Sequence, residues 1–174
     1  MSIQIITDCN GLKQGAIRGV LMEAFKKQPV SVKVIKEKDF TTPLTKEDFL
    51  LIAEKRIQYL AKNDLLLNER GCIPPWVFAT IIKGYYRVNG NWYLCCCAGF
   101  ATTQQSPILV NLGSSVPVPR VVSEKKNQDL ERNMSDILAE LNPGWNKDSV
   151  FNLLTKEDEM LWLQQPLRYI VKSI

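Results

Sequence analysis

A long β-hairpin is the feature of this sequence that most constrains its fold. Residues 76–86 are rich in β-branched and aromatic side chains, and residues 92–102 continue as a second apolar run. The residues between them include Asn89-Gly90, and an Asn-Gly pair is the strongest short-range signal for a tight hairpin turn. The sequence therefore predicts two long antiparallel strands that belong to a central sheet.

Strands and helices alternate ahead of the hairpin. A predicted strand over Ile3–Thr7 precedes a helix-like run over residues 14–27, and residues 30–35 alternate apolar and polar side chains as a strand does. Thr45 is a preferred N-cap residue with acids just after it, which predicts a helix over residues 47–62. This order of elements is typical of an α/β protein.

The rest of the chain adds a loop, two strands and two helices. Residues 63–75 are polar and broken, which indicates a loop. The segments expected after the hairpin are a strand over residues 106–112, a helix over residues 120–141, a short strand over residues 149–154 and a last helix over residues 163–172. The sequence thus predicts a single α/β domain over residues 1–174, with a mixed central sheet that contains the long hairpin and is flanked by helices.

Histidine is absent from the chain, and this excludes several kinds of chemistry. Ser-His and Cys-His nucleophiles, histidine general bases and histidine-ligated zinc all need that residue. The five cysteines are an odd number, include no C-x-x-C pair, and place three side by side at positions 95–97. They are expected to be buried thiols in a reducing compartment rather than disulfides or zinc ligands.

The net charge of +4 is spread along the chain rather than concentrated. A dense basic stripe would indicate a dedicated nucleic-acid binder, and the chain has only short pairs of lysines. A mildly basic protein is still suited to partners that carry phosphate. No apolar run is long enough to cross a bilayer and no targeting segment is recognised, so we expect a cytoplasmic protein with no membrane partner.

The turn after the first strand is the first candidate for ligand binding. Asn10, Gly11 and Lys13 follow the apolar run and lead into the first predicted helix. A strand-to-helix turn that carries an amide, a glycine and a lysine can hold a phosphate group at a helix N-terminus. The alternatives are that Asn10 only caps the helix and that Lys13 is only solvated.

Several segments, taken in order, resemble the inosine/xanthosine triphosphatase family, whose members hydrolyse non-canonical purine nucleoside triphosphates in a metal-dependent reaction. The matching segments are the Asn-x-x-Lys turn at residues 10–13, Ala16-Ile17 in the helix after it, the Ala-x-x-Arg element at residues 53–56, the hairpin, the Ser-x-x-x-Pro stretch at residues 115–119 and the closing Leu154-Thr155. They extend over nearly the whole chain. The resemblance implies an inosine triphosphatase-like fold, a purine nucleotide as ligand, and the pairing into a homodimer that is common in that family.

The chain departs from the family where the family holds its metal. A family strand ends in a carboxylate next to a glycine, whereas Gly84 here is preceded by Ile82 and Lys83. Isoleucine cannot ligate a hard cation, and lysine brings positive charge where Mg²⁺ needs negative charge. The glycine and arginine that follow the family's Leu-Thr are also missing after Thr155. The resemblance therefore implies a divergent and degenerate member in which catalysis is lost.

Four residues are the candidate phosphate ligands, namely Asn10, Lys13, Arg56 and Lys83. Arg56 has the alternative of facing water or pairing with a glutamate on its own helix. Lys83 lies among apolar strand residues and needs a partner, which can be a bound phosphate in place of the missing metal, unless its ammonium reaches solvent. No catalytic residue and no metal ligand is assigned, and the consecutive acids at residues 157–159 are expected to be solvated.

Three functions remain open at this stage. The first, which the missing acids favour, is a nucleotide-binding protein of the triphosphatase fold that has lost catalysis and needs no cofactor. The second is an active hydrolase of inosine or xanthosine triphosphate, with Mg²⁺ held by acids such as Glu37, Asp39 or Glu47. The third is an interaction subunit of a ribonucleoprotein or another large assembly that keeps the fold as a scaffold.

Overall fold

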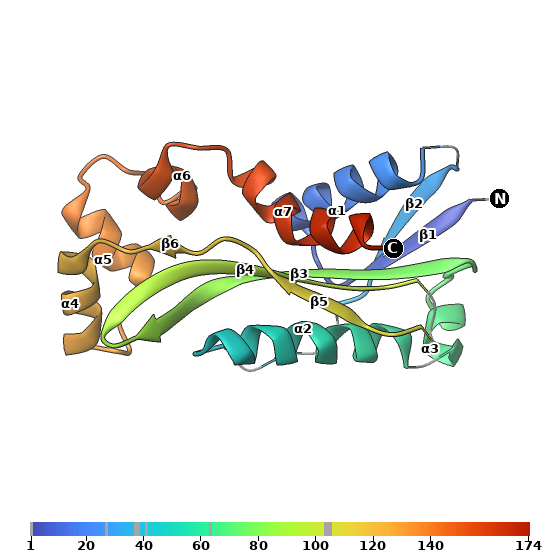
Figure 1. Cartoon of the computed structure of the whole chain (residues 1–174), viewed down its shortest axis with the longest axis horizontal. Helices are drawn as coiled ribbons and strands as arrows, with labels where there is room; N and C mark the ends of the chain where they lie inside the picture. Colours follow the sequence, from blue (N-terminus) through green and yellow to red (C-terminus); the bar gives the residue numbers. More distant parts are fainter. Residues whose placement is uncertain (1, 27, 37–38, 41, 63, 103–105) are drawn as a thin grey trace.

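The computed structural model describes residues 2–26, 28–36, 39–40, 42–62, 64–102 and 106–174. Within them, six strands form one sheet in the order β2-β1-β3-β4-β5, with β6 beside β4 (Figure 1). The strands are β1 (Ile3–Thr7), β2 (Val30–Val34), β3 (Trp76–Val88), β4 (Asn91–Ala101), β5 (Leu109–Leu112) and β6 (Val116–Pro117). The helices are α1 (Gly11–Ala24), α2 (Lys46–Ala61), α3 (Asp64–Glu69), α4 (Arg120–Gln128), α5 (Met134–Leu141), α6 (Val150–Thr155) and α7 (Glu159–Lys172).

The predicted hairpin is formed by β3 and β4. Val88 pairs with Asn91 across the turn, and Asn89 and Gly90 both have positive φ, 50° and 79°, as a tight Asn-Gly hairpin turn requires. β1 pairs in parallel with β2 and β3, whereas β4 pairs antiparallel with β3, β5 and β6. The predicted α/β class, with a mixed sheet that contains a long hairpin and is flanked by helices, is therefore confirmed.

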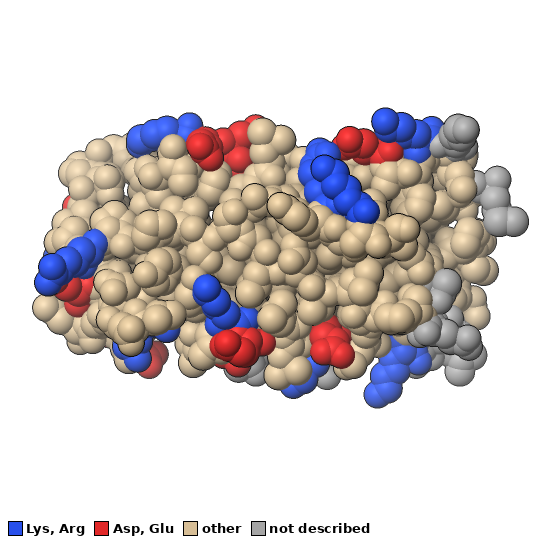
Figure 2. Space-filling view, viewed as in Figure 1, with Lys and Arg blue, Asp and Glu red and all other residues tan. Residues whose placement is uncertain are grey.

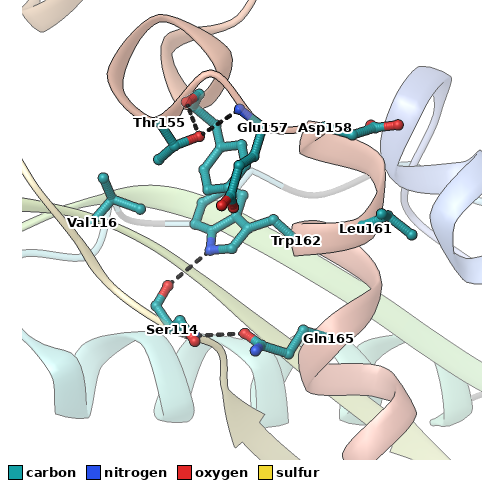
Figure 3. A pocket seen from close by; sticks show the side chains of 9 residues that line it. Ser114, Val116, Thr155, Glu157, Asp158, Leu161, Trp162 and Gln165 are labelled. Carbon is teal, nitrogen blue, oxygen red and sulfur yellow. Dashed lines mark hydrogen bonds between the residues drawn. The ribbon is translucent and has the colours of Figure 1, made fainter.

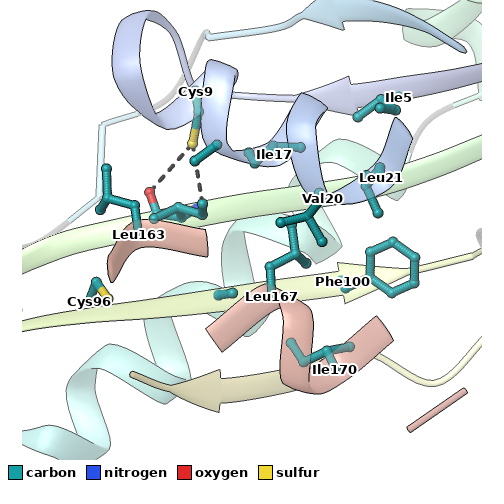
Figure 4. Packing of buried hydrophobic residues seen from close by; sticks show 14 of the residues in the cluster. Ile5, Cys9, Ile17, Val20, Leu21, Cys96, Phe100, Leu163, Leu167 and Ile170 are labelled. Atoms are coloured by element: carbon teal, nitrogen blue, oxygen red, sulfur yellow. Dashed lines mark hydrogen bonds between the residues drawn. The ribbon is translucent and has the colours of Figure 1, made fainter. Parts of the chain in front are cut away.

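Helices cover both faces of the sheet (Figure 1). α1 and α7 pack against each other on one face, and α2 packs on β3 and β4 from the other face. Figure 4 shows Leu21 of α1 and Leu167 of α7 on the side of Phe100 of β4, and Leu163 of α7 nearer to Cys9 and Cys96 in the same cluster. Each such side chain contributes about 1.5–3 kcal/mol when it is fully buried, so this face holds the largest share of the core.

A second group of helices covers the far end of the hairpin. α4, α5 and α6 lie at the left of Figure 1 and surround the end of β3–β4 that carries the turn. Trp92, next to that turn, belongs to a buried cluster with Val118, Val122, Ile137 and Leu138. We call α4, α5 and α6 the end lobe.

The helix expected over residues 120–141 is interrupted, so this prediction is wrong. α4 ends at Gln128 and α5 begins at Met134. The Lys126 ammonium donates to the Leu130 carbonyl at 2.6 Å between the two helices. The Asn133 side chain accepts a hydrogen bond from the next helix at 2.8 Å and caps α5, and this local bond favours a new helix start over continuation.

The strand expected over residues 149–154 is also wrong, because this segment is α6. Ser149 accepts a hydrogen bond from the Asn152 amide at 3.1 Å, and this cap starts a helical turn in an apolar run too short to distinguish helix from strand. The loop expected over residues 63–75 contains α3. The last helix begins at Glu159 rather than at residue 163.

The predictions for cysteine and charge agree with the structure. All five cysteines are buried free thiols. The face in Figure 2 shows lysine, arginine and acidic side chains scattered in small groups, with no continuous basic stripe on it. Among the described residues, no helix has both the length and the apolar character that a bilayer span needs.

Candidate functional site

The order of the strands creates a crevice at the carboxyl ends of β1 and β2. β1 lies between β2 and β3, and the helices that follow β1 and β2 cover opposite faces. In open α/β sheets, ligands bind at such a switch point, outside the carboxyl ends of the strands. A pocket of about 200 Å³ lies here, lined by Asp8, Cys9, Asn10, Lys13, Lys36, Asp39, Phe40 and Arg56. We call it the switch-point pocket.

The turn from β1 to α1 leaves its polar groups available for a ligand. Gly11 has a φ of +55°, in the left-handed region that favours glycine. Asn10 occupies the N-cap position, but its side chain makes no capping hydrogen bond within the described chain, so the predicted alternative of a simple helix cap is wrong. α1, whose residues are all described, has no acid in its first turn. No side chain of the first turn therefore neutralises the positive end of the helix.

Asp8 and Arg56 form an ion pair in this pocket. Arg56 Nη1 lies 2.9 Å from Asp8 Oδ2, and the buried Thr80 hydroxyl donates to Asp8 Oδ1 at 2.7 Å. The Arg56 guanidinium also lies 5.4 Å from the centre of the Phe40 ring, and its buried Nε has no hydrogen-bond partner among the described residues. The alternative that Arg56 faces water or pairs within its own helix is therefore wrong.

Lys13 is half-buried and has no hydrogen-bond or ion-pair partner in the part of the chain that the structure describes. Burial lowers the pKa of its ammonium, and the positive charges of Arg56 and Lys83 lower it further. The negative charge of Asp8 opposes this shift. Lys13 is thus partly buried rather than fully exposed, and an ammonium in this position gains from a bound anion.

Cys9 forms the floor of the pocket as a neutral thiol. It is buried, its Sγ donates to the Ile81 carbonyl at 3.4 Å, and it accepts from the Ile81 amide at 3.3 Å (Figure 4). Burial raises the pKa of the thiol, and the negative charge of Asp8 adds to the rise. A thiol held in this way packs and hydrogen-bonds but is a poor nucleophile.

Lys83 lies outside the residues that line the pocket. Its ammonium forms an ion pair with Glu159, at 2.6 Å between Lys83 Nζ and Glu159 Oε1. The Glu159 side chain is only 7% exposed, so the expectation that all three acids at residues 157–159 are solvated is wrong for Glu159. Three of the four predicted ligands thus share one pocket, and the fourth is held beside it by an acid that sequence reasoning missed.

The carboxylates of the pocket are a poor match for Mg²⁺. Asp8 already accepts hydrogen bonds on both oxygens, and Arg56, Lys13 and Lys36 bring positive charge to the same lining. Asp39 is the other described acid in the lining, and Glu37 lies outside the described residues. The described chain offers no group of three or more metal-ligating side chains. The donor set therefore fits an anion better than a divalent cation.

A second and larger cavity lies on the other side of the start of α7. It has a volume of about 530 Å³ and is lined by Ser114, Val116, Phe151, Thr155, Glu157, Asp158, Leu161, Trp162 and Gln165. Figure 3 shows its internal bonds, including the Trp162 indole that donates to the Ser114 carbonyl at 2.8 Å. The Trp162 ring stacks on Phe151 with centroids 4.5 Å apart. The polar groups of Ser114, Thr155, Trp162 and Gln165 bond to one another or to nearby backbone, which indicates a structural role for them.

The fold and the pocket together define an α/β protein with a cationic switch-point crevice. No protein-family model matches the chain, and no curated protein matches its sequence. Among solved structures, the chain is similar to protein VC0702 from Vibrio cholerae, with a TM-score of 0.67 and 16% identity over 99% of this chain and 97% of that one. At this level of identity the likeness shows the fold alone.

Proposed function

We propose that the protein binds a purine nucleotide through phosphate at the switch-point pocket and does not hydrolyse it. The observation that carries this proposal is the convergence of Asn10, Lys13 and Arg56 around the start of α1. An amide, an ammonium and a guanidinium beside a helix N-terminus are the groups that recognise phosphate oxygens. The purine is an expectation that comes from the family resemblance.

The state of the unliganded pocket supports an anionic ligand. Lys13 is a half-buried ammonium without a partner among the described residues, and the Asn10 side chain is exposed. Arg56 Nε is buried and likewise has no hydrogen-bond acceptor in the described chain. A phosphate group would supply acceptors to these donors at the positive end of α1, where negative charge is stabilised by about 0.3–1 kcal/mol or more.

Loss of catalysis is supported by the same residues. A hydrolase needs a base or a metal to activate water, and Asp8, the acid at the centre of the pocket, is bonded to Arg56 and Thr80. Ile82 and Lys83 stand where the resembled family has a carboxylate. We further propose a reducing cytoplasmic location for this protein, because its five cysteines are buried free thiols.

The test is a thermal-shift titration with inosine, xanthosine, adenosine and guanosine phosphates. A nucleotide at 100 times its Kd stabilises the folded state by about 2.7 kcal/mol, so we expect a clear rise in Tm for the unaltered protein. Lys13→Ala should abolish the rise. Lys55→Ala, at an exposed position of α2, is the matched control and should leave it intact.

Two results would contradict the proposal. The absence of any shift with millimolar purine nucleotides would reject nucleotide binding and leave the scaffold function, which co-purification of a large partner from native cells would support. Release of phosphate or pyrophosphate from inosine triphosphate with Mg²⁺, above background and lost in Lys13→Ala, would show an active hydrolase.

A further inference from the structure

The ion pair between Lys83 and Glu159 is a charged contact beside the switch-point pocket that the proposed function leaves unused. The two side chains differ in exposure, at 35% for Lys83 and 7% for Glu159. A carboxylate as buried as Glu159 needs a positive partner, because an uncompensated buried charge is strongly destabilising. A ligand that draws the Lys83 ammonium away therefore leaves the Glu159 carboxylate buried without a positive partner, which costs free energy.

The two partners also differ in freedom. Glu159 is the first residue of α7, and this start is fixed by Asp158, whose Oδ1 accepts a hydrogen bond from the Met160 amide at 2.8 Å. The helix N-terminus further favours a carboxylate at that position. Lys83 carries its charge on a flexible four-carbon stem. Glu159 is therefore the fixed partner, and the Lys83 ammonium is the one that can turn to another anion.

The pair lies close to the predicted phosphate ligands. The starts of α1 and α7 are in contact, since a Cβ placed on Gly15 would lie 3.2 Å from Met160 Cε. Gly15 is two residues beyond Lys13, and Met160 directly follows Glu159. The positive charge of Lys83 also contributes to the lowered pKa of Lys13, after burial and Arg56. A phosphate group at Lys13 would therefore lie within electrostatic range of Lys83, the member of the pair whose charge acts on Lys13.

Resting on the proposed function, we propose that Glu159 is a selectivity residue, which makes the switch-point pocket prefer a nucleoside monophosphate to the corresponding triphosphate. The described lining carries the cations Lys13, Lys36 and Arg56 and the acids Asp8 and Asp39, and the Lys83–Glu159 pair beside it is already neutral. A single phosphate group, with about two negative charges, therefore already offsets the remaining positive charge. The further phosphates of a triphosphate would lie against the Glu159 carboxylate or take Lys83 away from it, and both cost binding energy.

The experiment measures the affinities of inosine monophosphate and inosine triphosphate by calorimetry without divalent cations. The unaltered protein should bind the monophosphate at least as tightly as the triphosphate. Glu159→Gln keeps the shape of the side chain and removes its charge, so triphosphate affinity should rise about tenfold while monophosphate affinity changes much less. Adding Lys83→Met to Glu159→Gln should cancel the gain, because the released ammonium is then absent.

Glu157→Gln is the matched control, since Glu157 is exposed and faces the other cavity, and it should leave both affinities unchanged. If the unaltered protein binds inosine monophosphate but Glu159→Gln leaves the ratio of the two affinities unmoved, this inference is overturned and the proposed function stands. If neither protein binds either nucleotide, both proposals are overturned. If Glu159→Gln does not fold, a tighter binding of triphosphate than of monophosphate by the unaltered protein still overturns the selectivity.

Discussion

At the scale of single residues, Lys13 lowers the folding stability of the unliganded protein while it serves the proposed binding of phosphate. Its ammonium is half-buried beside Arg56 and Lys83. Lys13→Met removes this charge and keeps the apolar stem, so we expect the unliganded variant to be more stable at pH 7 by about 1 kcal/mol. Urea unfolding measures the difference, and Lys55→Met on the exposed face of α2 is the control that should show no gain.

The same variant predicts a pH dependence with a definite sign. Because burial lowers the pKa of Lys13 in the folded state, the charged form costs stability below that pKa. The cost disappears as the pH rises from the lowered pKa towards 10.5, where the unfolded chain binds the proton more tightly than the folded one. The advantage of Lys13→Met should therefore shrink with rising pH, and a constant or growing advantage would contradict a desolvated Lys13.

Sequence reasoning found the local part of this site and missed the long-range part. Asn10 and Lys13 sit in one strand-to-helix turn, where residue types and spacing suffice. Asp8 was missed because its value comes from Arg56 and Thr80, which are 48 and 72 residues away. Its signal was available, since it is an acid directly after a buried strand. Glu159 was expected to be solvated with its two acidic neighbours, because its pairing with Lys83, 76 residues away, leaves no local signal in the sequence.

At the scale of elements, α7 contains a proline whose effect on the helix is compensated by the sheet. Pro166 has no N–H, so the Trp162 carbonyl one turn earlier lacks its helical donor. The Cys96 thiol of β4 approaches that carbonyl at 3.6 Å. Burial raises the pKa of Cys96, so the thiol keeps the proton that it donates. One of the three adjacent cysteines, Cys96, thus supplies the hydrogen-bond donor that Pro166 cannot supply to the Trp162 carbonyl.

This pairing predicts a coupling between Cys96 and Pro166. Cys96→Ala should destabilise the protein by about 1–3 kcal/mol, because a buried carbonyl loses its donor. In a Pro166→Ala background the alanine amide can bond to the Trp162 carbonyl, so the same cysteine change should cost distinctly less. Urea unfolding of the two single variants and the double variant measures the coupling. Additive effects would mean that the thiol stabilises by packing alone.

The elements that sequence predicts well are those with their own local signal. Asn89-Gly90 determines the hairpin turn, and Thr45 starts α2 as expected, accepting from the Asp48 amide at 3.1 Å. α6 has a short apolar run that fits a strand or a helix, and its Ser149 cap decides in favour of the helix. The break between α4 and α5 likewise depends on side-chain bonds that periodicity does not report.

At the scale of the whole molecule, the hairpin connects two parts: the part of the sheet covered by α1, α2 and α7, and the end lobe. β3 and β4 extend from the sheet under α1 and α7 to the end lobe (Figure 1). The α/β class followed from the alternation of elements and from the Asn-Gly turn. The packing of the end lobe on the hairpin could not be predicted from the sequence, because it depends on contacts between α4 and the hairpin turn. The switch-point pocket lies in the part with the sheet, α1 and α7. Because this part and the end lobe have separate hydrophobic clusters, they can differ in the free energy of local unfolding.

Asn127 is the residue that tests this division. Its side chain accepts a hydrogen bond from the Trp92 indole at 2.9 Å and donates to the Gly90 carbonyl at 2.7 Å, so it ties α4 to the hairpin turn. Asn127→Ala leaves a buried indole N–H without this acceptor, at a cost of about 1–3 kcal/mol. Hydrogen exchange should accelerate at the amides of α4 and α5 while those of α1 stay protected, because the end lobe then opens without the sheet. Gln128→Ala, at the adjacent exposed position, should change neither set of amides. An equal acceleration in α1 and in the end lobe would show that the chain opens as one unit.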